Sequence, residues 1–312
     1  MIKSGLKWLD YFFVLRPTLF YPVWTVALAG HWAQARTMPT IQGGAVSETL
    51  VAFYLAGLTL VLGASFLINQ TMDIQSDQVN NKLYLIANGS ISLRAAYLET
   101  ALLCAVPILT ILFFRRDLAL LLVAAFLTTG WAYSLPPLSL KDRPIGGGLT
   151  NFLGGLTIFS YGWCLQAGCS LSMLLHSLPY LLAVLAVYFL TTIPDRHGDA
   201  AAAKITAAVQ WGTPKTILAG FIAELGAVAT AVWMRDPVIL TASLLALPFF
   251  IRTVLKQNEG SVQQTCKYSI LFLSLIMCIR FPVYLFLIVL VFFASKWYYR
   301  VRFAVNYPSL NT

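Results

Sequence analysis

Long apolar stretches, separated by short polar connections, follow one another along nearly the whole chain. A helix needs about 20 apolar residues to cross a hydrocarbon core about 30 Å thick, and each stretch is close to that length. The pattern therefore predicts an all-α integral membrane protein with nine transmembrane helices. The predicted spans are residues 17–34, 49–69, 95–114, 117–136, 148–168, 172–192, 214–234, 237–255 and 269–294.

The composition supports a membrane protein and leaves little room for a water-soluble domain. Hydrophobic residues make up 59% and charged residues 11% of the 312 residues, whereas a soluble domain is roughly 45 to 50% apolar. We therefore expect a single membrane domain over residues 1–312. The first span lacks a small-residue cleavage site behind a short apolar core, which indicates a retained helix rather than a signal peptide.

The basic residues predict the orientation in the membrane. If the N-terminus lies inside, the inner loops carry thirteen lysines and arginines and the outer loops carry four, which is a positive-inside bias. The net charge of +9 suits anionic lipid headgroups and a polyphosphate substrate. We find no RNA-binding motif, so nucleic acid is not an expected partner. No feature of the pattern indicates an oligomeric state.

The last predicted span is interrupted by the tripeptide Arg280-Phe281-Pro282. Proline lacks a backbone N–H group and kinks or breaks a helix. We expect one kinked helix here, which would leave the C-terminal tail outside. The alternative is a broken hairpin that returns the tail to the inside.

Two short acidic phrases stand at matching points of this nearly uncharged chain. The first covers residues 69–77 and ends one apolar span, and the second covers residues 195–199 and ends another. In each phrase two aspartates are four residues apart, and a lysine follows five residues after the second aspartate. With their lysines, the phrases are motifs at residues 69–82 and 195–204, and they predict that the domain consists of two pseudo-repeated halves. The aspartates are Asp73, Asp77, Asp195 and Asp199, and the lysines are Lys82 and Lys204.

The aspartates of these phrases predict a metal site. On a helix, residues four apart share one face, and two carboxylates at that spacing repel each other unless a cation lies between them. Mg²⁺ binds one or two carboxylates and completes its octahedron with water and phosphate oxygens. The alternative is that each aspartate is a solvated acid at a helix end, but the repeated spacing favours a magnesium-bridged phosphate.

A third polar phrase, residues 133–148, lies between the two acidic phrases. Its prolines and glycines are typical of an ordered turn. The basic residues Lys141 and Arg143 could bind phosphate oxygens that the metal leaves free. Alternatively, they are only the positive residues expected of an inner loop.

In these phrases the chain resembles the UbiA superfamily of membrane prenyltransferases. The resemblance rests on the first motif, written Asn-Asp/Gln-x-x-Asp-x-x-x-Asp in the family and present here at residues 69–77. It is supported by Asp-x-x-x-Asp at residues 195–199, by Arg16-Pro17-Thr18 before the first span, and by Tyr-Ser-x-Pro-Pro at residues 133–137. It implies nine transmembrane helices around a central cavity, with a cytoplasmic cap formed by the motif-bearing loops.

The resemblance also implies the activity and the site. Family members transfer a prenyl group from a Mg²⁺-bound isoprenyl diphosphate to a hydrophobic acceptor within the bilayer. Carried over by position, the four aspartates would be catalytic metal ligands, with Asn69 supporting the first pair. The implied substrate-binding residues are Arg16, Asn69, Lys82, Tyr133, Lys141, Arg143 and Lys204.

The wording of the first motif resembles the homogentisate prenyltransferase and chlorophyll synthase branch, which implies an aromatic, quinone-precursor-like acceptor. The second motif departs from that branch. Thr192 and Ala200 stand where relatives tend to have an acid and a base, and Arg196 and His197 are unusual within the motif. These departures affect two expectations from the resemblance, namely the residues of the second metal site and the identity of the acceptor.

Other functions remain open from the sequence. The acceptor could be a non-aromatic lipid, a tetrapyrrole or a sugar phosphate. The chain could also be a family member without catalysis or a cation-coupled transporter, although a transporter would be expected to have its ionisable groups near the midplane.

Polar groups within the spans are expected to have structural roles. Glu224 lies near the middle of the seventh span, where a hydrogen bond to a neighbouring helix is the simpler interpretation and a functional role the alternative. The five cysteines form no C-x-x-C pair, and we expect them to be core-packing thiols.

Overall fold

The structure is a computed structural model that describes residues 4–37, 46–79 and 85–308. Throughout these residues the chain is helical and contains no strand. The elements are the 3-10 helices η1 (Ser4–Leu9), η2 (Pro17–Leu19) and η4 (Leu140–Asp142), the π-helix η3 (Leu127–Ala132), and the α-helices α1 (Asp10–Phe13), α2 (Phe20–Thr37), α3 (Glu48–Met72), α4 (Ile74–Val79), α5 (Leu93–Phe114), α6 (Arg116–Phe126), α7 (Pro144–Ala167), α8 (Ser172–Thr191), α9 (Arg196–Ala201), α10 (Ala207–Trp233), α11 (Pro237–Lys256), α12 (Glu259–Arg280) and α13 (Pro282–Phe303).

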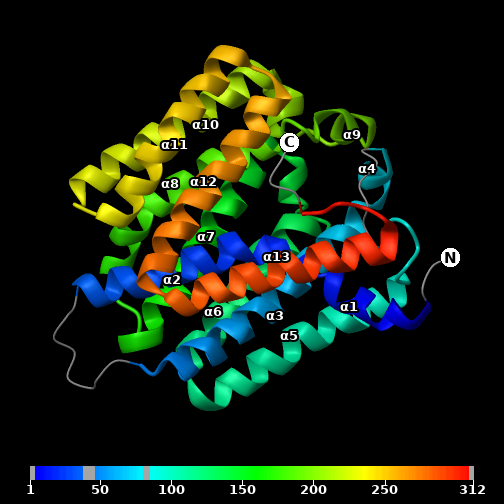
Figure 1. The fold of residues 1–312 in the computed structure, drawn as a ribbon, viewed down its shortest axis with the longest axis horizontal. Helices are drawn as coiled ribbons and strands as arrows, with labels where there is room; N and C mark the ends of the chain where they lie inside the picture. Colours follow the sequence, from blue (N-terminus) through cyan, green and yellow to red (C-terminus); the bar gives the residue numbers. More distant parts are fainter. Residues whose placement is uncertain (1–3, 38–45, 80–84, 309–312) are drawn as a thin grey trace.

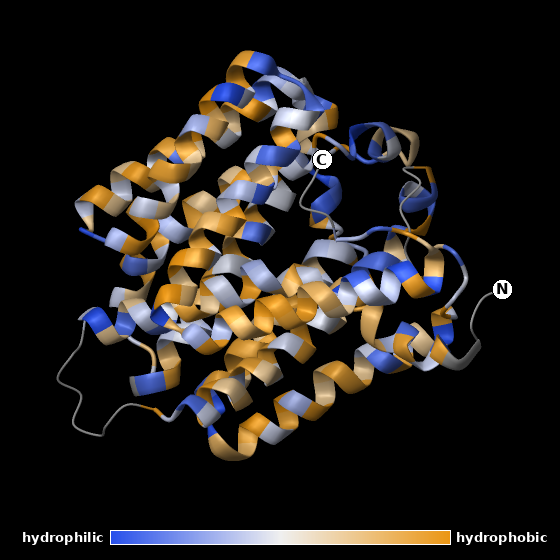
Figure 2. Ribbon diagram, viewed as in Figure 1, coloured by the Kyte–Doolittle hydropathy of each residue, from blue (hydrophilic) through white to orange (hydrophobic). Residues whose placement is uncertain are grey.

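The long helices form one bundle, and the short helices α4 and α9 lie side by side at one end of it (Figure 1). We call the end that carries α4 and α9 the site end. The long helices are rich in apolar residues, whereas α4 and α9 are more polar (Figure 2). Eight of the described helical segments are long and apolar enough to cross a membrane. The expected all-helical membrane fold is therefore confirmed, although the count of nine spans is not.

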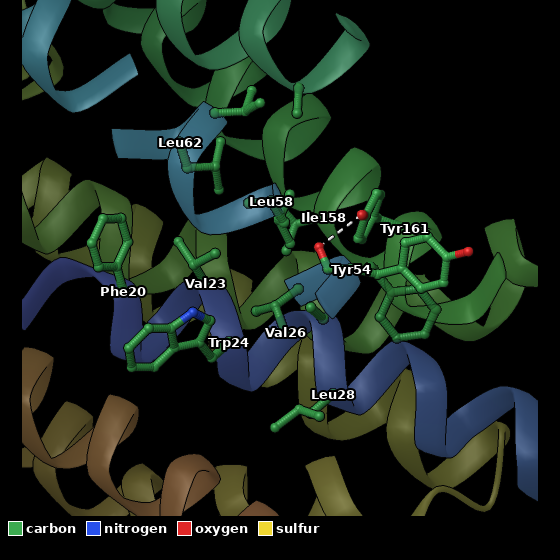
Figure 3. Packing of buried hydrophobic residues seen from close by; sticks show 14 of the residues in the cluster. Phe20, Val23, Trp24, Val26, Leu28, Tyr54, Leu58, Leu62, Ile158 and Tyr161 are labelled. Carbon is green, nitrogen blue, oxygen red and sulfur yellow. Dashed lines mark hydrogen bonds between the residues drawn. The ribbon is translucent and has the colours of Figure 1, made fainter. Parts of the chain in front are cut away.

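Close contact between α2 and α7 lies at the centre of the packing. A Cβ atom added to Gly162 would lie 1.7 Å from the carbonyl oxygen of Ala27, and one added to Gly30 would lie 2.1 Å from that of Phe159. Small residues of this kind let two backbones approach closely, which favours helix association in a membrane. Around the contact, buried side chains of α2, α3 and α7 pack into one core, and the Tyr161 hydroxyl donates to the carbonyl oxygen of Tyr54 at 2.8 Å (Figure 3).

The expectation of one kinked helix over residues 269–294 was wrong. Helix α12 ends at Arg280, and α13 begins at Pro282 as a separate helix. Proline fits the first turn of a new helix because its missing N–H group would have no partner there. Helix α13 then runs back to α1, where the Arg302 guanidinium and the Tyr298 hydroxyl bind the buried Asp10 carboxylate. The end of α13 therefore lies on the same side as α1, as in the broken hairpin.

The expectation of five core-packing thiols was also wrong, because Cys164 and Cys169 form a disulfide. Cys164 lies near the end of α7, which begins at the site end and is 24 residues long. At about 1.5 Å per residue this helix spans about 36 Å, so the disulfide lies at the far end of the bundle. The described free cysteines are Cys104, Cys266 and Cys278.

Candidate active site

The two acidic phrases meet at the site end of the bundle. Asp73 directly follows α3 and Asp77 lies in α4, while Asp195 precedes α9 and Asp199 lies within it. Each pair forms one helical turn: the amide N–H of Asp77 donates to the carbonyl of Asp73 at 2.8 Å, and that of Asp199 to the carbonyl of Asp195 at 2.9 Å. The i, i+4 spacing therefore does place the aspartates of each pair on one helical face, and packing of α4 on α9 brings the pairs together.

Two lysines contact acids of this end. The Lys141 ammonium lies 2.7 Å from Oδ1 of Asp73 as a close ion pair rather than a well-aligned hydrogen bond. Lys204 contacts the same Asp73 carboxylate, donates to Oγ of Ser76 at 2.9 Å and lies 3.9 Å from Oδ1 of Asp199. Lys204 therefore bridges the first and second acidic phrases.

Burial and charge act in opposite directions on these groups. Burial disfavours the ionised Asp73 carboxylate, but the two adjacent ammonium groups outweigh it and hold the pKa of Asp73 below its usual value. Burial likewise lowers the pKa of Lys141, although the negative charge of Asp73 opposes that shift. For Lys204, burial acts against the ammonium form, but the nearby carboxylates prevail and raise its pKa. The Asp73 carboxylate thus holds two cationic side chains at this end.

The third polar phrase packs into the same end. The amide N–H of Ile205 donates to the carbonyl of Asp142 at 3.0 Å, which joins this phrase to the second acidic phrase. Position 147 has room only for a glycine, because a Cβ atom there would lie 1.9 Å from the Tyr188 hydroxyl. The glycines of the phrase thus allow a tyrosine of α8 to approach the start of α7.

A cavity of about 540 Å³ opens between these phrases and extends into the bundle. Its site end is lined by the four aspartates, Lys141 and Lys204. Farther in, the lining is mainly apolar and comes from α2, α3, α7, α8, α10, α11 and α12, with the polar side chains of Tyr180, Glu224, Ser243 and Ser269 among it. A cavity with one charged end and one largely apolar end suits an amphipathic molecule.

Comparison with known proteins identifies the family. The model of the UbiA prenyltransferase family matches residues 23–276, which is most of the chain. The chain belongs to the UbiA prenyltransferase family. The resemblance predicted from the acidic phrases is thereby confirmed, and with it the expected class of enzyme, a membrane prenyltransferase. The protein is an integral membrane protein that crosses the bilayer several times.

Individual relatives support the same assignment. The bacteriochlorophyll synthase 34 kDa chain of Chloroflexus aurantiacus is 30% identical over 118 residues, which are 38% of this chain and 36% of that protein, so the match spans about a third of the relative's length. A UbiA homolog from Archaeoglobus fulgidus bound to GPP and Mg²⁺ has the same fold, with a TM-score of 0.65 and 19% identity over 90% of this chain and 99% of that one. A UbiA homolog from Aeropyrum pernix K1 also shares the fold, with a TM-score of 0.65 and 16% identity over 84% of this chain and 97% of that one.

Most of the site residues predicted from the UbiA resemblance line the cavity. Arg143 is exposed and is not part of the lining, and Lys82 lies outside the described residues. The aromatic residues Tyr161 and Trp163 are buried in the core and do not line the cavity. The predicted residues that line the cavity are Arg16, Asn69, Asp73, Asp77, Tyr133, Lys141, Asp195, Asp199 and Lys204.

One lining residue that sequence reasoning missed is Asn151, in the second turn of α7. Its side-chain N–H donates to the carbonyl of Gly147 at 2.9 Å, and its amide also interacts with the Tyr133 hydroxyl. The only available signal was an amide three residues after the glycine-rich phrase, inside an otherwise apolar span. Thr192, where the resemblance led us to expect an acid, donates its hydroxyl to the carbonyl of Phe189 at 2.8 Å, so it completes the last turn of α8.

The oxygen ligands of this UbiA site fit Mg²⁺ when a phosphate completes the coordination. Within the described residues, no group of three or more His, Cys, Asp or Glu side chains is placed to hold a metal ion. Each aspartate pair offers hard carboxylate oxygens, and Mg²⁺ in phosphate sites commonly uses only one or two carboxylates. The side-chain N–H of Asn69 donates to Oγ of Ser134 at 3.2 Å, so the side-chain oxygen of Asn69 is not used in that contact.

Proposed function

We propose that this protein transfers a prenyl group from an isoprenyl diphosphate to a hydrophobic acceptor within the membrane, in a Mg²⁺-dependent reaction. The observation that carries the proposal is the single cavity that joins four aspartates and two lysines to an apolar interior. An isoprenyl diphosphate has the matching distribution of charge and hydrocarbon.

At the charged end, the protein would bind the diphosphate and stabilise it as a leaving group. Asp73 and Asp77 would hold one Mg²⁺ and Asp195 and Asp199 the other, with Asn69 supporting the first pair. The bound metal would neutralise part of the diphosphate charge and weaken its bond to the allylic carbon. Lys141 and Lys204, already held at this end by Asp73, would stabilise the negative charge that develops on the leaving group. Arg16 lines the same cavity and would add a further positive charge.

At the apolar end, the protein would exclude water from the allylic cation. Side chains of α2, α7 and α8 surround this part of the cavity, and a dry lining protects a reactive cation from hydrolysis. Tyr133 and Tyr188 line the cavity near the aspartates. Their ring faces would stabilise positive charge on the departing prenyl group.

For the acceptor, we propose an aromatic, quinone-precursor-like compound. The Asn69-Gln70 wording of the first motif and the similarity to a bacteriochlorophyll synthase chain both favour the homogentisate prenyltransferase and chlorophyll synthase branch. A tetrapyrrole, a non-aromatic lipid or a sugar phosphate would be the alternative acceptor. Assays with representatives of each class distinguish them by the prenylated product.

We propose further that the site end faces the cytoplasm. The positive-inside bias of the loops supports this orientation. The Cys164–Cys169 disulfide at the opposite end also supports it, because disulfides persist in oxidising compartments rather than in the cytosol. A membrane-impermeant thiol reagent applied to sealed inverted vesicles should label a cysteine placed at Arg143 without permeabilisation, and labelling only after permeabilisation would contradict the orientation.

The proposed reaction is tested with the full chain in lipid nanodiscs, supplied with Mg²⁺, a panel of isoprenyl diphosphates and a panel of acceptors. We expect Mg²⁺-dependent release of diphosphate and a prenylated product. Asp73→Ala and Asp195→Ala should lose most turnover while the protein remains folded and inserted in the nanodisc. Release of no diphosphate by folded protein would overturn the proposal. Binding of the donor without release would instead indicate a family member without catalysis, and uptake into sealed vesicles would indicate a transporter.

A further inference from the structure

A second polar site lies in the apolar part of the cavity. Glu224 of α10 and Ser243 of α11 both line the cavity, and each is only 2% exposed. Both come from helices that carry none of the four aspartates.

The packing of α10 on α8 places Glu224 well inside the bundle. A Cβ atom on Gly220 would contact Ala186 and Leu190, and one on Gly226 would contact Leu182. Glu224 therefore lies about level with Ala183, roughly eight residues or 12 Å along α8 from the last residues before the second acidic phrase. At that depth the carboxyl group is separated from the lysines and from the place of the diphosphate.

Two other buried acids of this protein each bind a cationic side chain and a tyrosine hydroxyl, and Glu224 differs from them. Asp10 binds Arg302 and Tyr298, and the deeply buried Asp236 binds Arg36 and Tyr180. By contrast, the contact of the Glu224 carboxyl is with Ser243. The Ser243 Oγ atom is buried without a well-formed hydrogen bond to any described residue.

Such groups are costly to bury unless something else binds them. They line an open cavity rather than a sealed core, so a ligand can reach them. The hydrocarbon tail of an isoprenyl diphosphate offers no hydrogen-bond donor, and an anionic group would be disfavoured next to a carboxyl group. A neutral hydroxyl group of the acceptor has the chemistry that suits both groups.

We infer that Glu224 and Ser243 form a polar subsite that binds a hydroxyl group of the acceptor inside the membrane-embedded part of the cavity. The inference rests on the proposed function, since it takes the acceptor and the prenyl donor to share this cavity. In this subsite Glu224 accepts a hydrogen bond from the acceptor hydroxyl, and Ser243 donates to or accepts from the same group. The subsite selects acceptors with a free hydroxyl group and orients them, and it does not take part in release of diphosphate.

The test compares a lipophilic diol with its ether. The full chain in detergent is titrated by calorimetry with 2-tert-butylhydroquinone and with its dimethyl ether, which has the same ring but no hydroxyl donor. Each titration is done with Mg²⁺, in the presence and absence of a thio-diphosphate analogue of the prenyl donor that cannot be cleaved. We expect the natural chain to bind the diol at least about tenfold more tightly than the ether.

The variants localise that preference. Glu224→Leu should remove the tenfold preference, Glu224→Gln should keep part of it because the amide oxygen still accepts, and Ser243→Ala should reduce it less than Glu224→Leu. The matched control is Glu99→Leu, which removes a glutamate of α5 that lines a different pocket. Glu99→Leu should keep the full preference.

The outcomes separate this inference from the proposed function. Unchanged affinity for the donor analogue in every variant would show that the variants are folded and that the diphosphate end is intact. Equal affinity of the natural chain for diol and ether, including absence of binding of both, would overturn the subsite. Persistence of the preference in Glu224→Leu would overturn it as well. Failure of the natural chain to bind the donor analogue would contradict the proposed function, whatever the result with the ring compounds.

Discussion

Lys204 contacts the Asp73 carboxylate across 131 positions of sequence and so joins the two acidic phrases. Lys204 follows five residues after the last aspartate of the second phrase, whereas Asp73 belongs to the first. Because the same ammonium group also lies 3.9 Å from Asp199 and 4.0 Å from Asp142, one side chain meets all three polar phrases. The lysine predicted as the trailing residue of one half therefore binds the acid of the other half.

We expect Lys204→Met to lower the rate of Mg²⁺-dependent diphosphate release by about a hundredfold or more. The substitution removes a positive charge from the place where negative charge develops on the leaving group, and donors of that kind typically contribute this much to catalysis. The rate is measured with saturating donor in nanodiscs. Arg143→Gln is the control, since Arg143 is exposed and does not line the cavity. A loss in Arg143→Gln equal to that in Lys204→Met would contradict the assignment.

The lowered pKa of Asp73 predicts a pH dependence of stability. Because the pKa is lower in the folded protein than the usual value of about 3.9, the ionised carboxylate stabilises the fold above that pH. This contribution is lost as the pH falls through the lower, folded-state pKa. The difference in unfolding temperature between the natural chain and Asp73→Asn should therefore be largest near neutral pH and should shrink toward pH 3. Exposed Glu48→Gln should give little difference throughout, and a constant difference for Asp73→Asn would refute the argument.

Local patterns predicted the geometry within each acidic phrase better than the path of the chain. The spacing of Asp73 and Asp77 was enough to place them on one helical turn, because helical periodicity is a local property. The approach of Lys204 to Asp73 depends on how α4 packs against α9, which no local pattern contains. For the same reason the role of Arg143 could not be distinguished from that of Lys141, although both lie in the same loop.

The remaining differences concern long-range contacts. The end of α13 is held beside α1 by Asp10, a residue whose partner lies almost the whole chain away. Apolar periodicity marks residues 269–294 as hydrophobic but does not reveal whether Pro282 kinks a helix or starts a new one. The Cys164–Cys169 disulfide depended on the chain turning back directly after α7. The division into two pseudo-repeated halves within a single domain stays a prediction.

We expect Gly162→Ala to destabilise the protein strongly. The added methyl group would lie 1.7 Å from the carbonyl oxygen of Ala27, so α2 and α7 would have to separate. Overpacking of this kind typically costs about 1 to 3 kcal/mol, and here the obstacle is backbone rather than a mobile side chain. Thermal unfolding in detergent measures the loss. Gly226→Ala is the matched control, because its methyl group would meet only Leu182 at 3.4 Å, an ordinary contact. Equal stability of the two variants would show that the close approach of α2 and α7 is wrong.

We expect Asp10→Asn to loosen α13 from the bundle. Arg302 binds Asp10 with its side chain 5% exposed and that of Asp10 2% exposed, so the substitution leaves a buried guanidinium without its counter-charge. Removing one partner of a buried pair typically costs roughly 3 to 5 kcal/mol. Because the pair holds the last turn of α13, limited proteolysis should cut the C-terminal segment faster in Asp10→Asn than in the natural chain. Glu48→Gln, which changes an exposed acid to an amide in the first turn of α3, serves as the control and should be cut at the natural rate. If Asp10→Asn were cut no faster than Glu48→Gln, the return of α13 to α1 would not depend on this ion pair.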